Sequence, residues 1–328
     1  MNFDYSLLSR FLFVLLALYF LAKRLKGKWK RKEVSFLISI FPCLLFSFIL
    51  LALYLQSIIP LASSIKLNDM KSFVILLLFA FTSFTLLAQS SGKNREYYQL
   101  ITYQFSTSAQ EQTIDAYLER ALLPALHRRS IKNVGVFKPI ANDTSVNKII
   151  YVLIPSKKIE TLADLSTQLL KDKEYLQAGK EYLEALYTNP SYQRMESTLM
   201  YAFTMAPKLI LPKLSGPKSD RVYELRSYES ATEKLYRNKV KMFNEGGEVV
   251  LFDRLQFNAI FYAEVISGSR MPNLMYMTSF ENMEERNKHW KSFVDDPEWK
   301  KLVAMEEYKN NVSKINIILS RAAAYSDY

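Results

Sequence analysis

The sequence has few of the residues that build metal and phosphate sites. Its 328 residues include one cysteine, two histidines and eight glycines. A single cysteine cannot form an internal disulfide framework. The sequence contains no HxH, HExxH or CxxC spacing, no G-x-S-x-G nucleophile elbow, no GxGxxG and no P-loop. Zinc sites, serine-hydrolase triads and phosphate cradles are therefore not expected, and we expect neither a metal nor a cofactor.

The net charge of +11 is unevenly distributed. Residues 1–88 hold 10 Lys/Arg and 3 Asp/Glu, whereas residues 89–328 hold 33 and 29. The excess is concentrated in "KRLKGKWKRK" (23–32), between two apolar runs, which is typical of a loop on the cytoplasmic side of a membrane. A nucleic-acid-binding protein would carry basic residues on its folded domains, interleaved with aromatics. We expect no nucleic-acid partner.

Three apolar runs lie at the start of the chain. Residues 7–22 form a short run that contains Arg10, and residues 34–60 form a run longer than the roughly 20 residues needed to span a bilayer. Residues 70–89, "MKSFVILLLFAFTSFTLLAQ", combine Met-Lys, an apolar core and a small residue followed by a polar one. That order is typical of a secretory signal peptide, with cleavage after Ala88.

These runs support two conflicting interpretations. If all three span a bilayer, residues 7–60 anchor the chain in a membrane, residues 70–88 form a third span, and the basic loop places the remainder in the cytoplasm. If translation starts at Met70, residues 70–88 are a signal peptide and the remainder is exported. Residues 1–69 are then an over-extended gene start or a membrane hairpin. We favour bacterial-type export to an extracytoplasmic location, secreted or periplasmic, over a membrane-anchored protein.

The remainder of the chain repeats itself. "YQLITY" (98–103) returns as "YELRSY" (223–228), 125 positions later. Three further matches follow in the same order at nearly the same spacing: Tyr151 with Tyr276, Asp172 with Asp296, and the pair Ser108 and Glu111 with the pair Ser230 and Glu233. Such a long period predicts two tandem domains of roughly one hundred residues each. We place them at 95–205 and 221–328, joined by a proline-rich linker at 206–220.

Both repeats are predicted to have the order strand, helix, strand, strand, helix, strand. Expected strands are 97–105, 133–140, 148–155 and 196–203, then 221–228, 257–266, 274–280 and 314–322, and expected helices are 109–128, 159–186 and 281–294. In the second repeat, Ser230 and Glu233 are expected to form a capping box at the start of a helix, and the "NEGGE" stretch is expected to end this helix. Asp296 is expected to cap a short helix that begins at Pro297.

This order is that of a ferredoxin-like α+β domain. A four-stranded sheet with helices on one face leaves its other face bare, and two such sheets can cover each other. The sequence therefore predicts two ferredoxin-like repeats packed as an intramolecular dimeric α/β barrel, so that further oligomerisation is possible but not required.

Strand alternation suggests a candidate pocket. We expect Tyr98, Leu100, Tyr223 and Leu225 beneath the helices. The opposite face of the same strands, lining the space between the sheets, carries Gln99, Tyr103, Glu224, Arg226 and Tyr228. A buried cluster of this kind is either mutually hydrogen-bonded or meets a ligand. Three interpretations follow: a structural salt-bridge network, a small-molecule pocket, or a catalytic site. An error of one residue in the alternation would move the whole set to the other face.

The two histidines favour structural interpretations. His127 follows the end of an expected helix, where a cation interacts well with the helix dipole. The alternative for His127 is an axial haem or metal ligand. His289 is expected to face solvent on the helix at 281–294.

The second repeat resembles the NIPSNAP domain. The resemblance rests on "YELRSY" at the start of the repeat and on "HWKSFVDDPEWKKL" near its end, with Trp290, Phe293, Asp296, Pro297 and Trp299. The first repeat is similar more loosely, with Lys173 in place of the proline. Together the two cover residues 95–328. The resemblance implies the dimeric α/β barrel fold, whose members include monooxygenases, isomerases and haem-handling proteins, but it implies no secure reaction.

Three functions remain open on this basis. The one we favour is a non-enzymatic protein that binds a small apolar or aromatic molecule, or a protein partner, through the inter-sheet pocket or its surface. The second is a cofactor-poor monooxygenase or isomerase, in which Arg226 and Tyr228 would polarise a substrate oxygen. The third is a membrane-tethered interaction module without a ligand.

Overall fold

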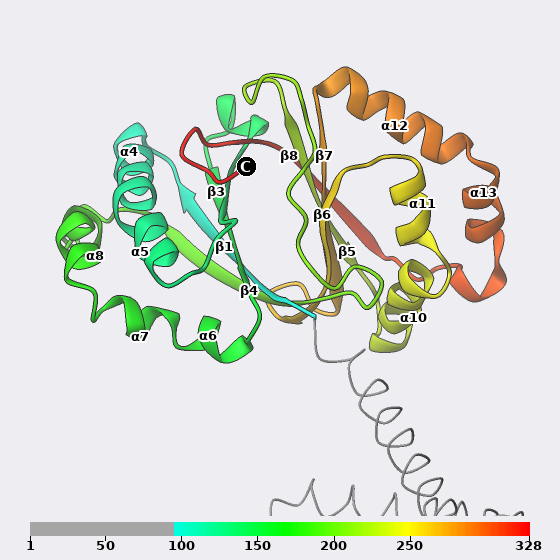
Figure 1. The fold of residues 1–328 in the computed structure, drawn as a ribbon, viewed down its shortest axis with the longest axis horizontal. Helices are drawn as coiled ribbons and strands as arrows, with labels where there is room; N and C mark the ends of the chain where they lie inside the picture. Colours follow the sequence, from blue (N-terminus) through cyan, green and yellow to red (C-terminus); the bar gives the residue numbers. More distant parts are fainter. Residues whose placement is uncertain (1–94) are drawn as a thin grey trace, which may run out of the picture. The chain divides into compact units, whose positions relative to one another are not determined.

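Eight antiparallel strands close into one barrel within residues 95–328, the part of the chain that the computed structural model describes (Figure 1). The first repeat contributes β1 (Tyr97–Phe105), β2 (Gly135–Pro139), β3 (Lys148–Ser156) and β4 (Arg194–Ala202). The second contributes β5 (Val222–Glu229), β6 (Ala259–Ser267), β7 (Asn273–Phe280) and β8 (Lys314–Ala322). The order around the barrel is β1-β3-β2-β8-β5-β7-β6-β4. The repeats therefore join at two seams, where β2 pairs with β8 and β4 pairs with β6.

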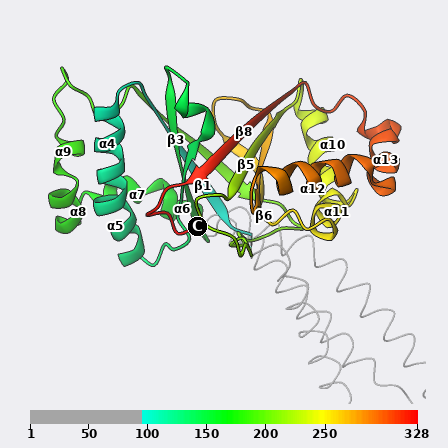
Figure 2. The ribbon, with the colours of Figure 1, turned by 90° about the horizontal axis from the view of Figure 1, so that it is seen from above.

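The helices cover the outside of the barrel, those of the first repeat on one side and those of the second on the other (Figures 1 and 2). The first repeat has α4 (Ser108–Tyr117), the π-helix η3 (Leu118–Leu122), α5 (Leu123–Arg128), the 3₁₀ helix η4 (Ile140–Asp143), α6 (Ile159–Ala163), α7 (Leu165–Leu169), α8 (Lys173–Ala178) and α9 (Lys180–Leu183). The second has α10 (Glu233–Asn244), α11 (Glu248–Arg254), α12 (Met283–Asp295), α13 (Pro297–Ala304) and η5 (Glu306–Tyr308). The predicted α+β barrel is confirmed.

Two helical predictions need correction. The single helix expected at 159–186 is four short helices, α6 to α9. In addition, α11 was not predicted, because the glycine pair before it indicates only the end of a helix. Gly247 adopts φ 87°, a left-handed conformation that glycine tolerates, and α11 begins at the next residue. The turn thus redirects the chain into a second helix instead of into a loop.

The predicted membrane segments fall outside the described residues. This applies to the candidate spans within 7–60 and to the signal peptide or third span at 70–88. Within 95–328, every helix is too short or too polar to cross a bilayer.

Threonines cap the first helix of each repeat. Thr107 Oγ1 accepts a hydrogen bond from the Gln110 amide at 3.2 Å, and Thr232 Oγ1 accepts one from the Leu235 amide at 3.3 Å. The two caps lie 125 positions apart, so they preserve the period of the repeat. The capping box expected at Ser230 is wrong, because its hydroxyl is buried and donates instead to a backbone carbonyl in the loop before β8.

The aspartate match between the repeats is structural. Asp172 and Asp296 are the N-caps of α8 and α13, as expected for Asp296. Each also binds an arginine at the end of an earlier helix of its repeat: Arg129, which follows α5, lies 2.8 Å from Asp172, and Arg254, the last residue of α11, lies 2.9 Å from Asp296. The guanidinium holds the pKa of each carboxyl below its ordinary value. One cap and one ion pair thus fix the same helix in both repeats.

The tyrosine match is not structural. Tyr151 on β3 pairs with Thr102 and faces the barrel interior, whereas Tyr276 on β7 pairs with Arg226 and faces the helices. The residue of β7 in the position of Tyr151 is Met275, one place earlier. The shared spacing of 125 therefore does not mean that the two tyrosines are equivalent.

Candidate functional site

The two faces of β1 and β5 are the reverse of those predicted. Tyr98, Leu100, Tyr223 and Leu225 belong to one buried cluster inside the barrel. They were expected beneath the helices. Nearly every residue of β5 is buried, on both faces. Apolar character could not distinguish the two faces in such a strand, so the phase of the alternation was off by one residue.

The five predicted pocket residues consequently lie outside the barrel. Glu224, Arg226 and Tyr228 lie between β5 and the helices of the second repeat. In the first repeat, Gln99 donates to Ser197 Oγ at 2.9 Å, and Tyr103 is buried in the core beneath the helices. The structure does not bring the five together into one site.

The three residues of the second repeat form a closed polar network. Arg226 Nε donates to Glu224 Oε1 at 2.6 Å. Arg286 Nε and Trp290 Nε1 donate to Glu224 Oε2 at 2.7 and 2.8 Å. Arg226 also donates to the Tyr228 hydroxyl at 3.2 Å, and its guanidinium stacks 3.6 Å from the centroid of the Trp290 ring. Because Glu224 is 0% exposed and has three protein donors, the geometry favours a structural network over a ligand site.

The residues that carried the NIPSNAP resemblance complete this core. Trp290 connects α12 to Glu224 of β5, and Phe293 packs 4.4 Å from Trp299, measured between ring centroids. Pro297 is the first residue of α13, directly after the Asp296 cap. These residues therefore hold the second helical layer against the sheet.

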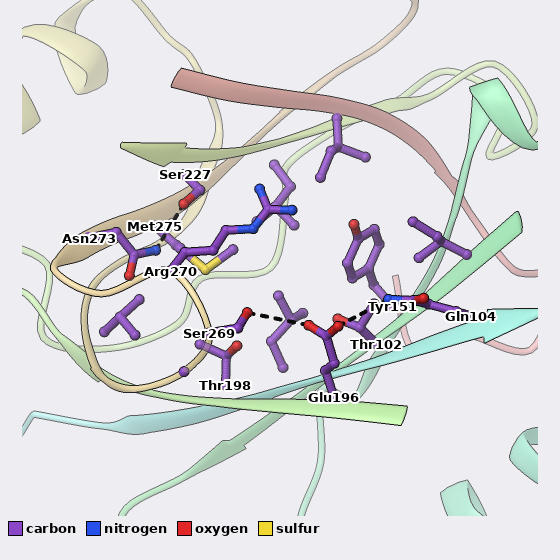
Figure 3. Close-up of a pocket in the computed structure, with 16 residues that line it drawn as sticks. Thr102, Gln104, Tyr151, Glu196, Thr198, Ser227, Ser269, Arg270, Asn273 and Met275 are labelled. Atoms are coloured by element: carbon purple, nitrogen blue, oxygen red, sulfur yellow. Dashed lines mark hydrogen bonds between the residues drawn. The ribbon is translucent and has the colours of Figure 1, made fainter. Parts of the chain in front are cut away.

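A pocket opens inside the barrel at the end away from Tyr98 and Tyr223. Figure 3 shows the residues that line it. Its volume is about 100 Å³, and both repeats contribute walls. We call it the mouth pocket. Its polar lining is Thr102, Gln104, Tyr151, Glu196, Thr198, Ser227, Ser269, Arg270 and Asn273, and its apolar lining is Leu100, Ile149, Leu225, Val265, Met275 and Ile318. An apolar floor with a few polar groups is the usual character of a small-molecule site.

Some polar groups of the mouth pocket hold each other. Gln104 Nε2 and Ser269 Oγ donate to the two oxygens of Glu196, at 3.1 and 3.4 Å. Asn273 Nδ2 donates to Ser227 Oγ at 2.9 Å, and its own oxygen is buried without a partner among the described residues. These bonds fix the Glu196 carboxylate, which belongs to the first repeat, and the Asn273 amide, which belongs to the second.

Tyr151 and Arg270 have free hydrogen-bonding capacity. Burial raises the pKa of Tyr151 to about 12, against the opposing effect of the nearby Arg270 charge, so the hydroxyl is protonated near neutral pH and can donate. Arg270 extends from the turn between β6 and β7 into the pocket (Figure 3). Its nearest carboxylate among the described residues is that of Glu229, at 3.8 Å. Two donors thus face the same cavity.

Comparison with known families identifies the second repeat. The NIPSNAP family model matches residues 223–327. This part of the chain matches the NIPSNAP domain. No curated protein sequence matches the chain.

Solved structures with similar backbones include NIPSNAP proteins and a candidate monooxygenase. A candidate monooxygenase from Lactobacillus acidophilus is 9% identical with a TM-score of 0.47, covering 70% of this chain and 94% of its own. A NIPSNAP-like domain protein from Burkholderia xenovorans is 16% identical with a TM-score of 0.30, covering 33% and 90%. A NIPSNAP family protein from Agrobacterium tumefaciens is 14% identical with a TM-score of 0.27, covering 30% and 90%.

Neither histidine belongs to the NIPSNAP domain's network or to the mouth pocket. His127, in the last turn of α5, lies 3.0 Å from Asp327. His289 was expected to face solvent but is half-buried, with Nδ1 2.9 Å from the Leu255 carbonyl oxygen and its ring near Phe257. Residues 95–328 contain no group of three or more His, Cys, Asp or Glu placed to hold a metal ion.

The Glu224 network of the NIPSNAP domain predicts a pH dependence. Burial alone would raise the pKa of the Glu224 carboxyl, but Arg286 and Arg226 outweigh it and hold that pKa below the ordinary value of 4.5. A lowered carboxyl pKa stabilises the folded state above the unfolded pKa, and this stability is lost as the pH falls through the folded pKa. We expect the destabilisation caused by Glu224→Gln to be full near neutral pH and to shrink below about pH 4.5. Urea unfolding of the wild-type protein and of Glu224→Gln across this pH range measures the destabilisation. A difference in the free energy of unfolding that is constant with pH would contradict the prediction.

The residues of the mouth pocket were not found from the sequence. Tyr151 was used only as a marker of the repeat, Arg270 was part of a turn, and Glu196 was the start of a strand. These three positions come from β3, β4 and the turn between β6 and β7, and they share no motif. The signal that could have found them is the alternation of residues along the strands. It identifies the residues that face the barrel interior only when the two faces are assigned correctly.

Proposed function

We propose that the barrel binds a small molecule in the mouth pocket, with an aromatic or apolar body and an oxygen acceptor as its head group. The observation that carries this proposal is the pairing of two free donors, Arg270 and the protonated Tyr151, with an apolar floor. The donors would hold a carboxylate or carbonyl oxygen, and Leu225, Met275 and Ile318 would contact the body.

The size of the pocket limits the ligand. Its volume of about 100 Å³ is below that of most ligand pockets, roughly 300–1,000 Å³, and is nearer to an engineered cavity of about 150 Å³ that holds benzene. A ligand with one ring is therefore the best fit, with any larger part projecting from the mouth.

Binding without chemistry is the role that we favour. A cofactor-poor monooxygenase or isomerase would use the same pocket, and the position of Tyr151 in its lining is the observation that favours it, because the hydroxyl can donate to a substrate oxygen. Arg226 and Tyr228, to which this role was first given, lie beneath the helices. A membrane-tethered role would depend on residues 7–60, and a protein partner remains a further proposal.

Titration with benzoate tests the proposal. In protein labelled with ¹³C at the methionine methyls, the Met275 signal should shift and saturate, while the signal of Met242, buried beneath the helices, should not. Arg270→Gln should weaken binding by about tenfold or more, because it removes a charge-assisted hydrogen bond, and Tyr151→Phe by about threefold to tenfold.

Controls separate specific binding from partition into an apolar space. Arg237→Gln, an exposed arginine on α10, should leave benzoate binding unchanged. Toluene has the same ring and no acceptor, so it should bind more weakly than benzoate. If Met275 does not respond, or if toluene binds as tightly and Arg270→Gln has no effect, the proposed function is wrong.

A further inference from the structure

Three tyrosines meet inside the barrel at the end opposite the mouth pocket. β5 lies four antiparallel steps from β1, so the two strands run in the same direction and their equivalent residues, Tyr98 and Tyr223, lie at the same end. Tyr328 joins them in the same buried cluster. The three residues are 0%, 0% and 3% exposed. None of their hydroxyls forms a hydrogen bond of normal length and angle with a described residue, although the Glu96 carboxylate lies near the Tyr98 hydroxyl and the Arg221 guanidinium near that of Tyr223.

Tyr328 reaches this end through the segment that follows β8. Residues 323–328, which we call the tail, lie along β2 (red in Figure 1). The Ala323 amide donates to the Val136 carbonyl at 2.9 Å, and the Asp327 amide donates to the Val134 carbonyl at 3.2 Å. These bonds carry the chain over the end of the barrel and direct the last ring inward.

The Tyr328 ring sits among aromatic side chains as a bound ligand would. Its centroid is 5.2 Å from that of Phe137 and 6.2 Å from that of Tyr223, both in edge-to-face geometry. The linker supplies the corresponding cover from the first repeat, because Leu209 packs on the same cluster and its amide donates to Glu96. The linker connects β4 to β5, and the tail follows β8.

We propose that this end of the barrel is a second binding site, for a neutral phenol-sized aromatic molecule, and that Tyr328 occupies the site when the molecule is absent. The aromatic walls fit a flat ring. A buried hydroxyl without a partner destabilises the state that contains it. The closed form contains three, and a phenolic ligand that displaces Tyr328 would pair with Tyr98 and Tyr223 while the Tyr328 hydroxyl gains water.

Electrostatics favour a neutral ligand over an anion. Burial raises the pKa of Tyr328 well above its ordinary value, and the Asp327 and Glu96 charges act in the same direction. The Arg221 charge lowers the pKa of Tyr223, but burial outweighs it and that pKa is raised as well. Those carboxylates would oppose a negative ligand as they oppose a tyrosinate. This separates the second site from the mouth pocket, where Arg270 provides a positive charge.

The test is a phenol titration of the full chain. Calorimetry measures the binding, and hydrogen exchange of the tail amides measures whether the tail leaves. Phenol should bind saturably and speed exchange of residues 323–328, because the tail must leave. Tyr328→Ala should bind phenol about tenfold more tightly, since no ring has to be displaced. When Tyr98→Phe or Tyr223→Phe is combined with Tyr328→Ala, phenol binding should weaken by about threefold to tenfold, the effect of one neutral hydrogen bond.

Matched variants define the remaining outcomes. Tyr187→Ala, at a tyrosine that is 95% exposed, should change nothing. Arg270→Gln should weaken benzoate binding by about tenfold or more and leave phenol binding unchanged, so the two sites fail independently. If Tyr328→Ala does not fold, Tyr328→Phe serves in its place: it keeps the ring, removes one unpaired hydroxyl from the closed form, and should weaken phenol binding about threefold.

Two results would overturn the inference. One is a wild-type chain that neither binds phenol nor changes its tail exchange. The other is benzene binding to Tyr328→Ala as tightly as phenol, with no effect of Tyr98→Phe, which would mean that the substitution has only made a hole.

Discussion

Glu224→Ala should lower the free energy of unfolding by about 3–5 kcal/mol, the usual effect of removing one partner from a buried ion pair. The carboxylate is fully buried and accepts from Arg226, Arg286 and Trp290. Without it, the Arg226 guanidinium, whose side chain is only 10% exposed, has no carboxylate partner. An uncompensated buried charge costs more than the lost hydrogen bonds alone.

The first repeat provides a matched control for this prediction. Its residues at the positions of Glu224 and Arg226 are Gln99 and Ile101. The double variant Glu224→Gln with Arg226→Ile should therefore be less destabilised than Glu224→Ala, because it removes the carboxylate together with Arg226, the more buried of its two arginine partners. Glu298→Ala, which removes an exposed carboxylate, should change stability little. Urea unfolding of residues 89–328 measures all three. If Glu224→Ala behaves like Glu298→Ala, the network does not stabilise the domain.

The two repeats hold their helices in different ways. The second repeat uses a buried ion network, whereas the first repeat has Gln99, Ile101 and Tyr103 at these positions: Gln99 binds Ser197, and the other two pack in an apolar cluster. Lys239 and Glu248 form another buried pair in the second repeat, 2.7 Å apart, and the position of Lys239 in the first repeat is Ile114. The two repeats thus keep one backbone with different cores.

The order of elements followed from local patterns in the sequence. Alternating strands, helical spacing and the Asp-Pro cap are short-range signals, and each was placed near its observed position. The face of β5 was not predictable from such signals, since the strand is buried on both sides. The mouth pocket depends on that face and on contacts between β3, β4 and the turn after β6, so its residues could be found only from the closed barrel.

The second repeat alone should form a homodimer. In the full barrel its inner face, with Tyr223, Leu225 and Phe261, is covered by the first repeat. Residues 206–328 alone would expose that face and leave β6 and β8 without their partners β4 and β2. Open edges beside an apolar face favour association. A second copy can supply both, with β6 of each copy pairing with β8 of the other.

Light scattering coupled to size-exclusion chromatography measures this directly. Residues 206–328 should elute with twice the chain mass, whereas residues 89–328, whose barrel is already closed, should elute as a monomer. Leu225→Lys places a charge in the inner face and should prevent dimerisation of the fragment. A folded monomer of residues 206–328 would contradict the prediction. A dimer would mean that the linker at 206–220 fixes which sheets meet, while the sheets themselves drive closure of the barrel.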